Sequence, residues 1–503
     1  MNIIIIGSLL LSILQSILFW DKNLGISVMM FTIPTIIFLI YILEKNKKIQ
    51  DKKAIIFSIP IILLSSTYFI FNNTFFRILN IFVIIILLII MCIYLSKKKL
   101  KLPEFMYNIL AIILGSLESI EEVLKFFKPR KKENEQKNDP NLRKLGKSIL
   151  ISAPIIIVVL LLLISADEIF ANMFQGVFTF LENIVSVPNT FDLIIRIIFI
   201  AITFMIIAGF IINLIAKNTM YNQEEIEEDK QEYKSGINIE NMTINTIFTI
   251  LNIIYLIFSI IQFTNLFSTI GNDPNFDYAN YARQGFFQLM FVSFINFIII
   301  FIAKINKQEK TKNETKYTKY MSILTIIFTI IIIISAFYRM SLYEQEYGYT
   351  YLRLFVYFIL ITELIITIPV IAYILGKKID LLKTIITITS TMYLILNFIN
   401  IDNIIAKNNI DRYLEDPEEN EIDIGYLITS TNTDAISQLT RLLNTNDQKV
   451  VESVKNYLYN EQRELEIEEM DFQELNLSKI EAKNALSNID LRIEEEKNYE
   501  DFR

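Results

Sequence analysis

Carboxylates and amides inside apolar stretches are the strongest candidates for chemistry in this chain. Glu363 lies in the middle of the apolar segment 352–375 and is the only carboxylate near the centre of any such segment. Burial disfavours the charged form, so we expect Glu363 to be protonated or paired. One interpretation is a proton or cation site. The other is a neutral, hydrogen-bonded side chain that joins helices.

A polar stripe runs along one face of another apolar segment, because its members recur at seven-residue spacing or one helical turn further on. In the segment 244–267 the stripe consists of Asn245, Asn252, Ser259 and Gln262. The segment 286–303 adds Gln288, Ser293 and Asn296. Facing side chains of this kind either hydrogen-bond between helices or line an aqueous path, and packing is the more common use.

Charged residues gather in three polar segments, 165–170, 273–285 and 338–353. They are Asp167, Glu168, Asp273, Asp277, Arg283, Arg339, Glu344, Glu346 and Arg353. Arginines and carboxylates at one membrane depth can form an ion-paired network or bind a charged ligand, and we favour structural ion pairs. The tyrosines between them also fit an aromatic belt at the membrane surface.

The composition excludes several kinds of enzyme. The 503 residues include no histidine, so a Ser-His-Asp triad and histidine-ligated zinc or haem are impossible. The single Cys92 cannot form an intrachain disulfide or a cysteine metal cluster. No phosphate-binding or dinucleotide-binding glycine motif occurs. We therefore expect no enzymatic activity, no cofactor and no metal.

The elements that carry these residues are membrane-spanning helices. Hydrophobic residues make up 53% of the chain, its mean hydropathy is +0.43, and a span needs about 20 mostly apolar residues. We count eleven spans: 3–20, 25–43, 54–71, 78–95, 149–166, 193–215, 244–267, 286–303, 321–337, 352–375 and 381–399. The last is the weakest, because Lys383 and several threonines dilute it.

Lysine and arginine alternate from loop to loop. The loops 44–53, 96–148, 216–243, 304–320 and 376–383 together carry 30 of these residues, whereas 21–24, 72–77, 167–192, 268–285 and 338–351 carry 4. Because basic loops stay in the cytoplasm, the N-terminus is predicted to be cytoplasmic and, with eleven spans, the C-terminal tail to be outside. If the last segment only dips into the membrane, the tail is cytoplasmic instead.

The chain divides into four regions: an N-terminal four-span region, 1–96; a basic cytoplasmic loop, 97–148; a seven-span core, 149–399; and a tail, 400–503. In the basic loop, 105–117 is predicted to be an interfacial helix. Lys128, Arg130, Lys131 and Lys132 follow it and fit contact with anionic lipid, or simply determine topology. Nucleic-acid binding is not expected.

The tail is acidic and is predicted to be helical. It contains 9 Asp and 16 Glu against 6 Lys and 5 Arg, a net charge of −14. Ile436, Leu439 and Leu442 recur at helical spacing, and 450–470 and 475–493 are amphipathic. We expect a short helical bundle or helical hairpins. The fold class is thus all-α: a polytopic transmembrane helical bundle of about eleven spans with an acidic helical extramembrane tail.

Four stretches resemble the landmarks of a bacterial family of polytopic membrane proteins known only as a domain of unknown function. They are LLLLISADEIF at 160–170, YARQGFFQLMFVSFINF at 281–297, YRMSLYEQEYGYTYLRL at 338–354, and NIDNIIAKNNIDRYLE at 400–415 followed by IDIGYLITSTNTDAISQLTRLL at 422–443. In the fourth, Lys407 and Asn408 replace the Arg-Tyr of the family pattern. The resemblance covers about 145–445 and implies fold kinship and a membrane location, without an activity.

Two functions are compatible with these features. The first is a non-enzymatic protein of the bacterial cytoplasmic membrane, an envelope sensor or assembly partner that acts through its outer loops and tail with an unidentified protein partner. The second is a transporter or channel that uses Glu363 and the polar stripe. Transport requires Glu363, Asn252 and Ser259 to face one solvent-connected cavity.

Overall fold

The computed structural model describes residues 1–96, 102–127, 188–215, 239–268, 285–306, 312–418 and 420–491. In these ranges the chain is helical and forms no strand. The long helices are α1 (Asn2–Phe19), α2 (Ser27–Lys45), α3 (Ser58–Ile70), α4 (Thr74–Ser96), α5 (Leu102–Phe127), α8 (Pro188–Ile215), α9 (Asn241–Ser268), α11 (Phe286–Ile305), α12 (Lys312–Tyr347), α13 (Tyr351–Ile374) and α14 (Leu381–Phe398).

Ten of the described helical segments are long and apolar enough to cross a membrane. They correspond to ten of the eleven predicted spans, including the weakest, which forms α14. The one predicted span without a counterpart, 149–166, lies outside the described residues. The prediction of a polytopic helical bundle is confirmed, and the protein is an integral membrane protein.

The chain forms two compact units. The first comprises residues 1–65, 83–221 and 471–475. Within it, α1 packs against α2 and α8, and α5 packs along α8. Glycine permits the close approach of α5 and α8, since a Cβ on Gly209 would lie 2.6 Å from the carbonyl oxygen of Ser116. The Asn213 amide donates to the carbonyl of Ile112 at 2.9 Å.

Helix α5 includes the predicted interfacial helix, 105–117, and continues to Phe127. Helix α5 is not among the ten candidate spans. Its position in the membrane interface stays a prediction. The basic residues that follow it, Lys128, Arg130, Lys131 and Lys132, lie outside the described residues.

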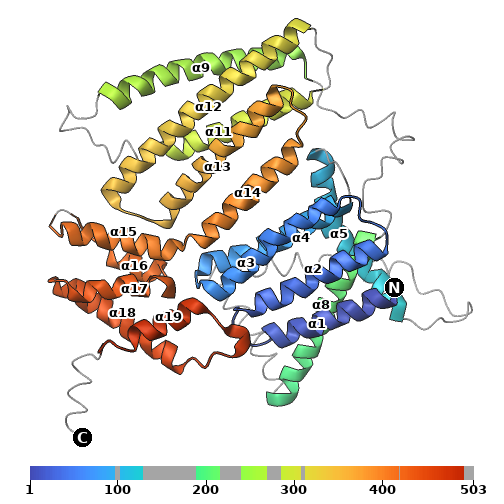
Figure 1. Cartoon of the computed structure of the whole chain (residues 1–503), viewed down its shortest axis with the longest axis vertical. Coiled ribbons are helices and arrows are strands. Elements are labelled where there is room, and N and C mark those ends of the chain that lie inside the picture. Colours follow the sequence, from blue (N-terminus) through green and yellow to red (C-terminus); the bar gives the residue numbers. More distant parts are fainter. Residues whose placement is uncertain are drawn as a thin grey trace, which may run out of the picture. The chain divides into compact units, whose positions relative to one another are not determined.

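The second unit comprises 66–82, 222–470 and 476–503. Its membrane helices pack in the order α9, α12, α13 and α14, and α11 contacts both α12 and α13 (Figure 1). The residues 66–82, which end α3 and begin α4, belong to this unit. They carry a lysine-poor loop, 71–73, between the two helices.

The tail continues the second unit as a small helical assembly at one end of α14 (Figure 1). Its elements are α15 (Ile401–Glu415), α16 (Ile424–Ser430), η2 (Thr433–Ala435), α17 (Ile436–Leu439), η3 (Thr440–Asn444), α18 (Gln448–Ile467), η4 (Phe472–Glu474) and α19 (Leu477–Leu486). Except for η4, which belongs to the first unit, these elements place their apolar faces in one core that also includes Phe76 and Leu396 from the membrane helices. The prediction of a short helical bundle is confirmed.

Local sequence explains how these tail helices begin. Side chains of Asp423, Asp447 and Asn476 accept hydrogen bonds from backbone N–H groups at the starts of α16, α18 and α19. Asn400 does the same for α15 while its backbone adopts a left-handed conformation with φ of 52°. Asparagine tolerates that conformation, so the chain can turn sharply as it leaves α14.

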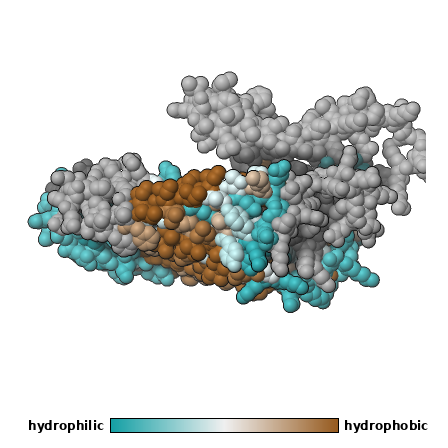
Figure 2. Space-filling model, turned by 90° about the horizontal axis from the view of Figure 1, so that it is seen from above, coloured by the Kyte–Doolittle hydropathy of each residue, from teal (hydrophilic) through white to brown (hydrophobic). Residues whose placement is uncertain are grey.

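Figure 2 shows a band of hydrophobic surface with hydrophilic residues on either side of it. Large apolar side chains on the membrane helices account for such surface. On α9, for example, Ile250, Ile254 and Ile257 are each more than half exposed. Exposed apolar side chains at this density match contact with lipid tails rather than with water.

The tail core generates a stability prediction. Leu439 is completely buried in it, and Leu439→Ala removes that packing and leaves a cavity. We expect the free energy of unfolding of the tail to fall by about 3 kcal/mol. Leu414, which is 40% exposed, is the control, and Leu414→Ala should cost less than about 1 kcal/mol. Urea titration with proteolysis of residues 401–491 as the readout measures both. Equal losses would contradict the assigned core.

Candidate functional site: a buried polar junction

The polar stripe of α9 faces α12. The hydroxyl of Thr318 donates to Asn245 at 2.8 Å, and that of Thr325 donates to Asn252 at 3.0 Å. Further along, Ser335 donates to Gln262 at 2.8 Å. Three polar side chains of α9 therefore each bond to a hydroxyl at the same level of α12, and the stripe joins the two helices.

The remaining member of the stripe, Ser259, lies beside a second set of contacts. Ser259 donates to the carbonyl of Tyr255 in its own helix at 2.7 Å. Tyr255 in turn donates to Asn296 at 2.6 Å, and Asn296 donates to Thr329 at 2.9 Å. A polar side chain from each of α9, α11 and α12 thus meets its partners inside the bundle. Such bonds stabilise helix association by roughly 0.6 kcal/mol each.

Glu363 lies between α13 and α11. It is 7% exposed, and its carboxylate accepts a hydrogen bond from the Ser293 hydroxyl at 2.5 Å. Among the described residues, one cavity lies around Asp402 and another around Thr246. Neither is lined by Glu363, Asn252 or Ser259. The geometry required for transport is not present at either cavity.

Four members of the predicted outer-face network are described, and one of them, Glu346, accepts a hydrogen bond from Arg412 at its backbone carbonyl. Arg339 donates to Gln262 at 3.2 Å. Glu344 accepts from the Tyr357 hydroxyl at 3.2 Å. Arg353 donates to the backbone carbonyls of Tyr347 and Gly348. The other five, Asp167, Glu168, Asp273, Asp277 and Arg283, lie outside the described residues, so the network itself stays a prediction.

Arg353 is buried at the start of α13. Its guanidinium stacks over the ring of Tyr343, 4.3 Å from the ring centroid, and 5.8 Å from that of Tyr347. Aromatic faces and carbonyl oxygens therefore surround this cation, an arrangement that stabilises a guanidinium without a carboxylate.

The same turn contacts the tail. Gly348 has a positive φ of 76°, and a Cβ there would lie 2.3 Å from the Asn409 side-chain oxygen. The Asn409 amide accepts from the N–H of Tyr349 at 2.7 Å and donates to its carbonyl at 2.8 Å. Arg412 also donates to the carbonyl of Glu346 at 2.8 Å. Helix α15 is thus bonded to the loop between α12 and α13.

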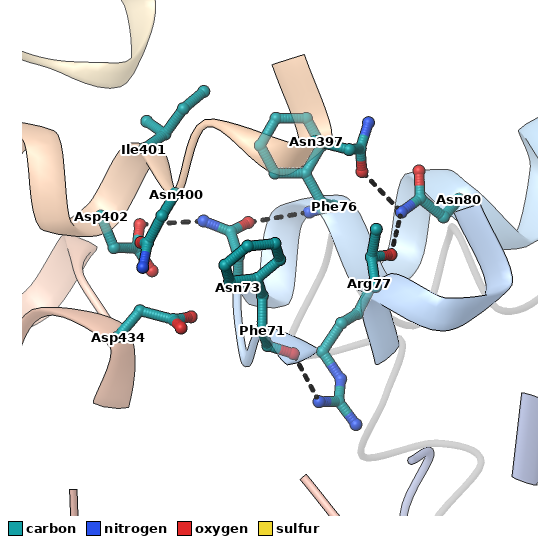
Figure 3. Close-up of a pocket in the computed structure, with 11 residues that line it drawn as sticks. Phe71, Asn73, Phe76, Arg77, Asn80, Asn397, Asn400, Ile401, Asp402 and Asp434 are labelled. Atoms are coloured by element: carbon teal, nitrogen blue, oxygen red, sulfur yellow. Dashed lines mark hydrogen bonds between the residues drawn. The ribbon is translucent and has the colours of Figure 1, made fainter. Parts of the chain in front are cut away.

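A cluster of polar side chains lies where α14, α15 and η2 meet the start of α4 (Figure 3). We call it the polar junction: Asn72, Asn73, Arg77, Asn80, Asn397, Asp402, Asn432 and Asp434. Asp402 is its most buried charged residue, with 1% of the residue exposed. It accepts hydrogen bonds from the Asn73 amide at 2.8 Å and from the Asn432 amide at 3.1 Å. The Asn432 backbone N–H adds a third bond at 3.3 Å.

Asn73 has two roles in the junction. Its amide nitrogen donates to Asp402, and its oxygen accepts from the N–H of Phe76 at 2.9 Å. The second bond satisfies a backbone group in the first turn of α4, as a helix cap does. The junction therefore holds α4 in place and binds the tail with one side chain.

Asp434 supplies the second carboxylate. Its oxygen accepts from the backbone N–H of Asn72 at 2.7 Å, and Arg77 donates to the Asn72 side chain at 2.9 Å. On the membrane side, Asn80 donates to Asn397 at 2.7 Å. These contacts enclose a cavity of about 20 Å³, which is room for about one water molecule.

The electrostatics of the junction follow from burial. Burial raises the pKa of Asp402 to about 7, and the nearby Asp434 carboxylate contributes in the same direction, whereas the hydrogen bonds from Asn432 and Asn73 oppose the shift. Burial also raises the pKa of Asp434, against the bonds from Asn72 and Ser478 and the charge of Arg77. No group of three or more His, Cys, Asp or Glu suited to a metal occurs in the described part of the chain.

Sequence comparison places these residues in a family. A family profile described as a domain of unknown function (DUF4153) matches residues 58–442. The chain belongs to this family. The match begins in the third span, so the family region is longer at its N-terminal side than the expected start near residue 145. No curated protein and no solved structure shows significant similarity to the chain.

Every residue of the polar junction lies within the family region, 58–442. Sequence reasoning did not select any of them, because Asn73 and Asp402 are 329 residues apart and each lies next to a predicted span end. One signal was present: the fourth family-like stretch contains both Asp402 and Asp434.

Asn73→Ala tests the junction. The change removes a donor to buried Asp402 and the cap of α4, so we expect the tail to lose about 2–3 kcal/mol of stability. Asn408→Ala is the control, because the Asn408 amide bonds only to the carbonyl of Ile404 in its own helix, and its effect should stay below about 1 kcal/mol. Urea-dependent proteolysis of the tail measures both, and indistinguishable variants would contradict a junction centred on Asn73.

Glu363→Gln separates packing from charge in α13. Glutamine keeps an oxygen that accepts from Ser293, so a packing role predicts a melting temperature and membrane yield close to those of the unchanged protein. Glu363→Lys places a cation among apolar side chains and should abolish accumulation in the membrane. A thermal-shift assay in detergent measures the melting temperature, and the amount of protein in isolated membranes measures the yield. A severe loss on glutamine substitution would show that the ionisable carboxyl itself is needed.

Proposed function

We propose that this protein is a non-enzymatic component of the bacterial cytoplasmic membrane that holds a folded helical tail at the outer face, where the tail acts as an envelope sensor or assembly partner. The observation that carries the proposal is the attachment of the tail. It has its own core and is also bonded to membrane helices through the polar junction.

The side of the membrane follows from which loops the tail contacts. In the second unit the tail bonds to residues 72–74 and 346–349, which belong to the lysine-poor loops. In the first unit, residues 471–475 bond to the lysine-poor loop 21–26 through Asn23 and Ile26. Since lysine-poor loops face outward, these contacts support a tail outside the cell and a cytoplasmic N-terminus.

The alternative of transport gains no support. The polar stripe on α9 bonds to α12, and Glu363 bonds to Ser293. Packing therefore accounts for the residues that transport would use. Contact of the basic run from Lys128 to Lys132 with anionic lipid remains part of the proposal, since it lies on the predicted cytoplasmic side.

A single-cysteine experiment tests both side and role. The natural Cys92 is completely buried, so it should react slowly. Exposed Asp447 is changed to cysteine, and intact cells are treated with a membrane-impermeant maleimide that carries a photo-crosslinker. We expect Asp447→Cys to be labelled and to form a protein adduct after illumination.

Gln50→Cys in the predicted cytoplasmic loop is the matched control, and it should be labelled only after the membrane is opened. Asp447→Cys that needs an opened membrane would overturn the outer placement. Labelling in intact cells without any adduct, repeated at Glu421→Cys, would overturn the role as an assembly partner.

A further inference from the structure

Two carboxylates of the tail are buried together in the polar junction. Asp402 and Asp434 line the same small cavity, with Asn73, Arg77 and Asn400 (Figure 3). Among the described residues, the side chains that donate to Asp402 are the amides of Asn73 and Asn432. Amides partly offset the desolvation of a carboxylate but do not neutralise its charge. The junction therefore holds more negative charge than its partners compensate.

Other charged and titratable groups around the junction change this balance little. Arg77 acts on Asp434 from α4, and it also bonds to Asn72. Tyr426 of α16 and Tyr457 of α18 face Asp402, and burial raises the pKa of each. Further carboxylates lie nearby: Glu481 near Asp434, Glu468 near Arg77, and Glu461 beside Tyr457. Two other cations act on these neighbours, since Lys479 pairs with Glu468 and Arg353 acts on Tyr426. Among the described residues, Arg77 is the cation that acts on Asp434 itself.

We propose that the polar junction is a proton-controlled latch, in which proton uptake by the Asp402–Asp434 pair tightens the attachment of the tail to the start of α4. The bonds support this direction. A neutral Asp402 still accepts from Asn73 and Asn432, because each carboxyl oxygen has lone pairs to spare. Protonation removes the repulsion between the two carboxylates and the cost of burying a charge, and it breaks none of these bonds.

The sign of the pH dependence follows from linkage. Asp402 has a pKa of about 7 when the tail is attached and about 3.9 when the residue is solvated. Between these values the attached state binds one more proton than the detached state. Attachment is therefore strongest at low pH and weakens as pH rises to about 7, above which Asp402 is ionised in both states.

The compartment whose pH is sensed depends on the proposed outer placement of the tail, whereas the latch does not. If the tail lies outside, acidification of the medium tightens it and neutral or alkaline medium releases it. Detergent-solubilised protein reports on the latch alone, and the labelling of Asp447→Cys reports on the side alone. The two proposals therefore fail separately.

Hydrogen exchange of the purified full-length chain at pH 5 to 8.5 tests the latch. Protection factors, which are corrected for the intrinsic exchange rate at each pH, are measured for Ile405 and Ile410, two buried residues of α15. We expect protection to fall by about tenfold per pH unit between pH 5 and 7 and to level off above pH 8. Protection that does not change with pH would overturn the latch.

Two variants locate the proton. Asp402→Asn keeps the shape and removes the ionisable group, so the pH dependence should largely disappear; Asp434→Asn should reduce it in part. Asp411→Asn on the same helix is the control, since Asp411 is paired with Arg441 at a half-exposed site, and it should keep the full dependence. If the dependence survives in both Asp402→Asn and Asp434→Asn, the proton binds elsewhere and the proposal is wrong. If a variant does not fold, the pH dependence of hydrogen-exchange protection in the unchanged protein still tests the latch.

Discussion

Satisfying buried polar groups is the constraint on which the rest of this structure depends. A hydroxyl or amide without a partner in an apolar surrounding costs several kcal/mol. Many of the described groups in the membrane helices bond either to a backbone carbonyl of their own helix or to a polar side chain of a neighbouring helix. The hydrogen-bonded pairs between α9 and α12 are an example, with Thr318 bonded to Asn245 and Thr325 bonded to Asn252.

Polar pairs of this kind also fix the geometry of the helices. Apolar contacts between membrane helices are nearly interchangeable with contacts to lipid, so they select a register only weakly. A hydrogen bond between Asn252 and Thr325 is lost if either helix slides by one turn. In the described structure, Asn245, Asn252 and Gln262 of the stripe bond to α12 and so fix its register against α9.

At the end of the bundle the same chemistry gives a different result. Around Asp402 the partners are amides, which satisfy hydrogen bonding but leave the charge uncompensated. In the latch that we propose, the strength of tail attachment depends on whether Asp402 is protonated.

Much of the fold was predictable because it is locally encoded. A run of about 20 apolar residues predicts a spanning helix. The alternation of lysine-rich and lysine-poor loops predicts the side of the membrane on which each loop lies. The tail helices were predictable in part, since Ile436, Leu439 and Leu442 share a face. The partners of the α9 stripe could not be predicted, because periodicity shows that a face is polar but not what that face contacts.

The class of protein, the ten described spans and the exclusion of histidine chemistry follow from composition and from neighbours along the chain. Which polar residues meet depends instead on the folded arrangement of distant segments. Asn72 and Asp434 are 362 residues apart, and a hydrogen bond at that separation leaves no trace in local pattern. The polar junction exists because folding brings the ends of α3, α4 and α14 to the same place as the tail.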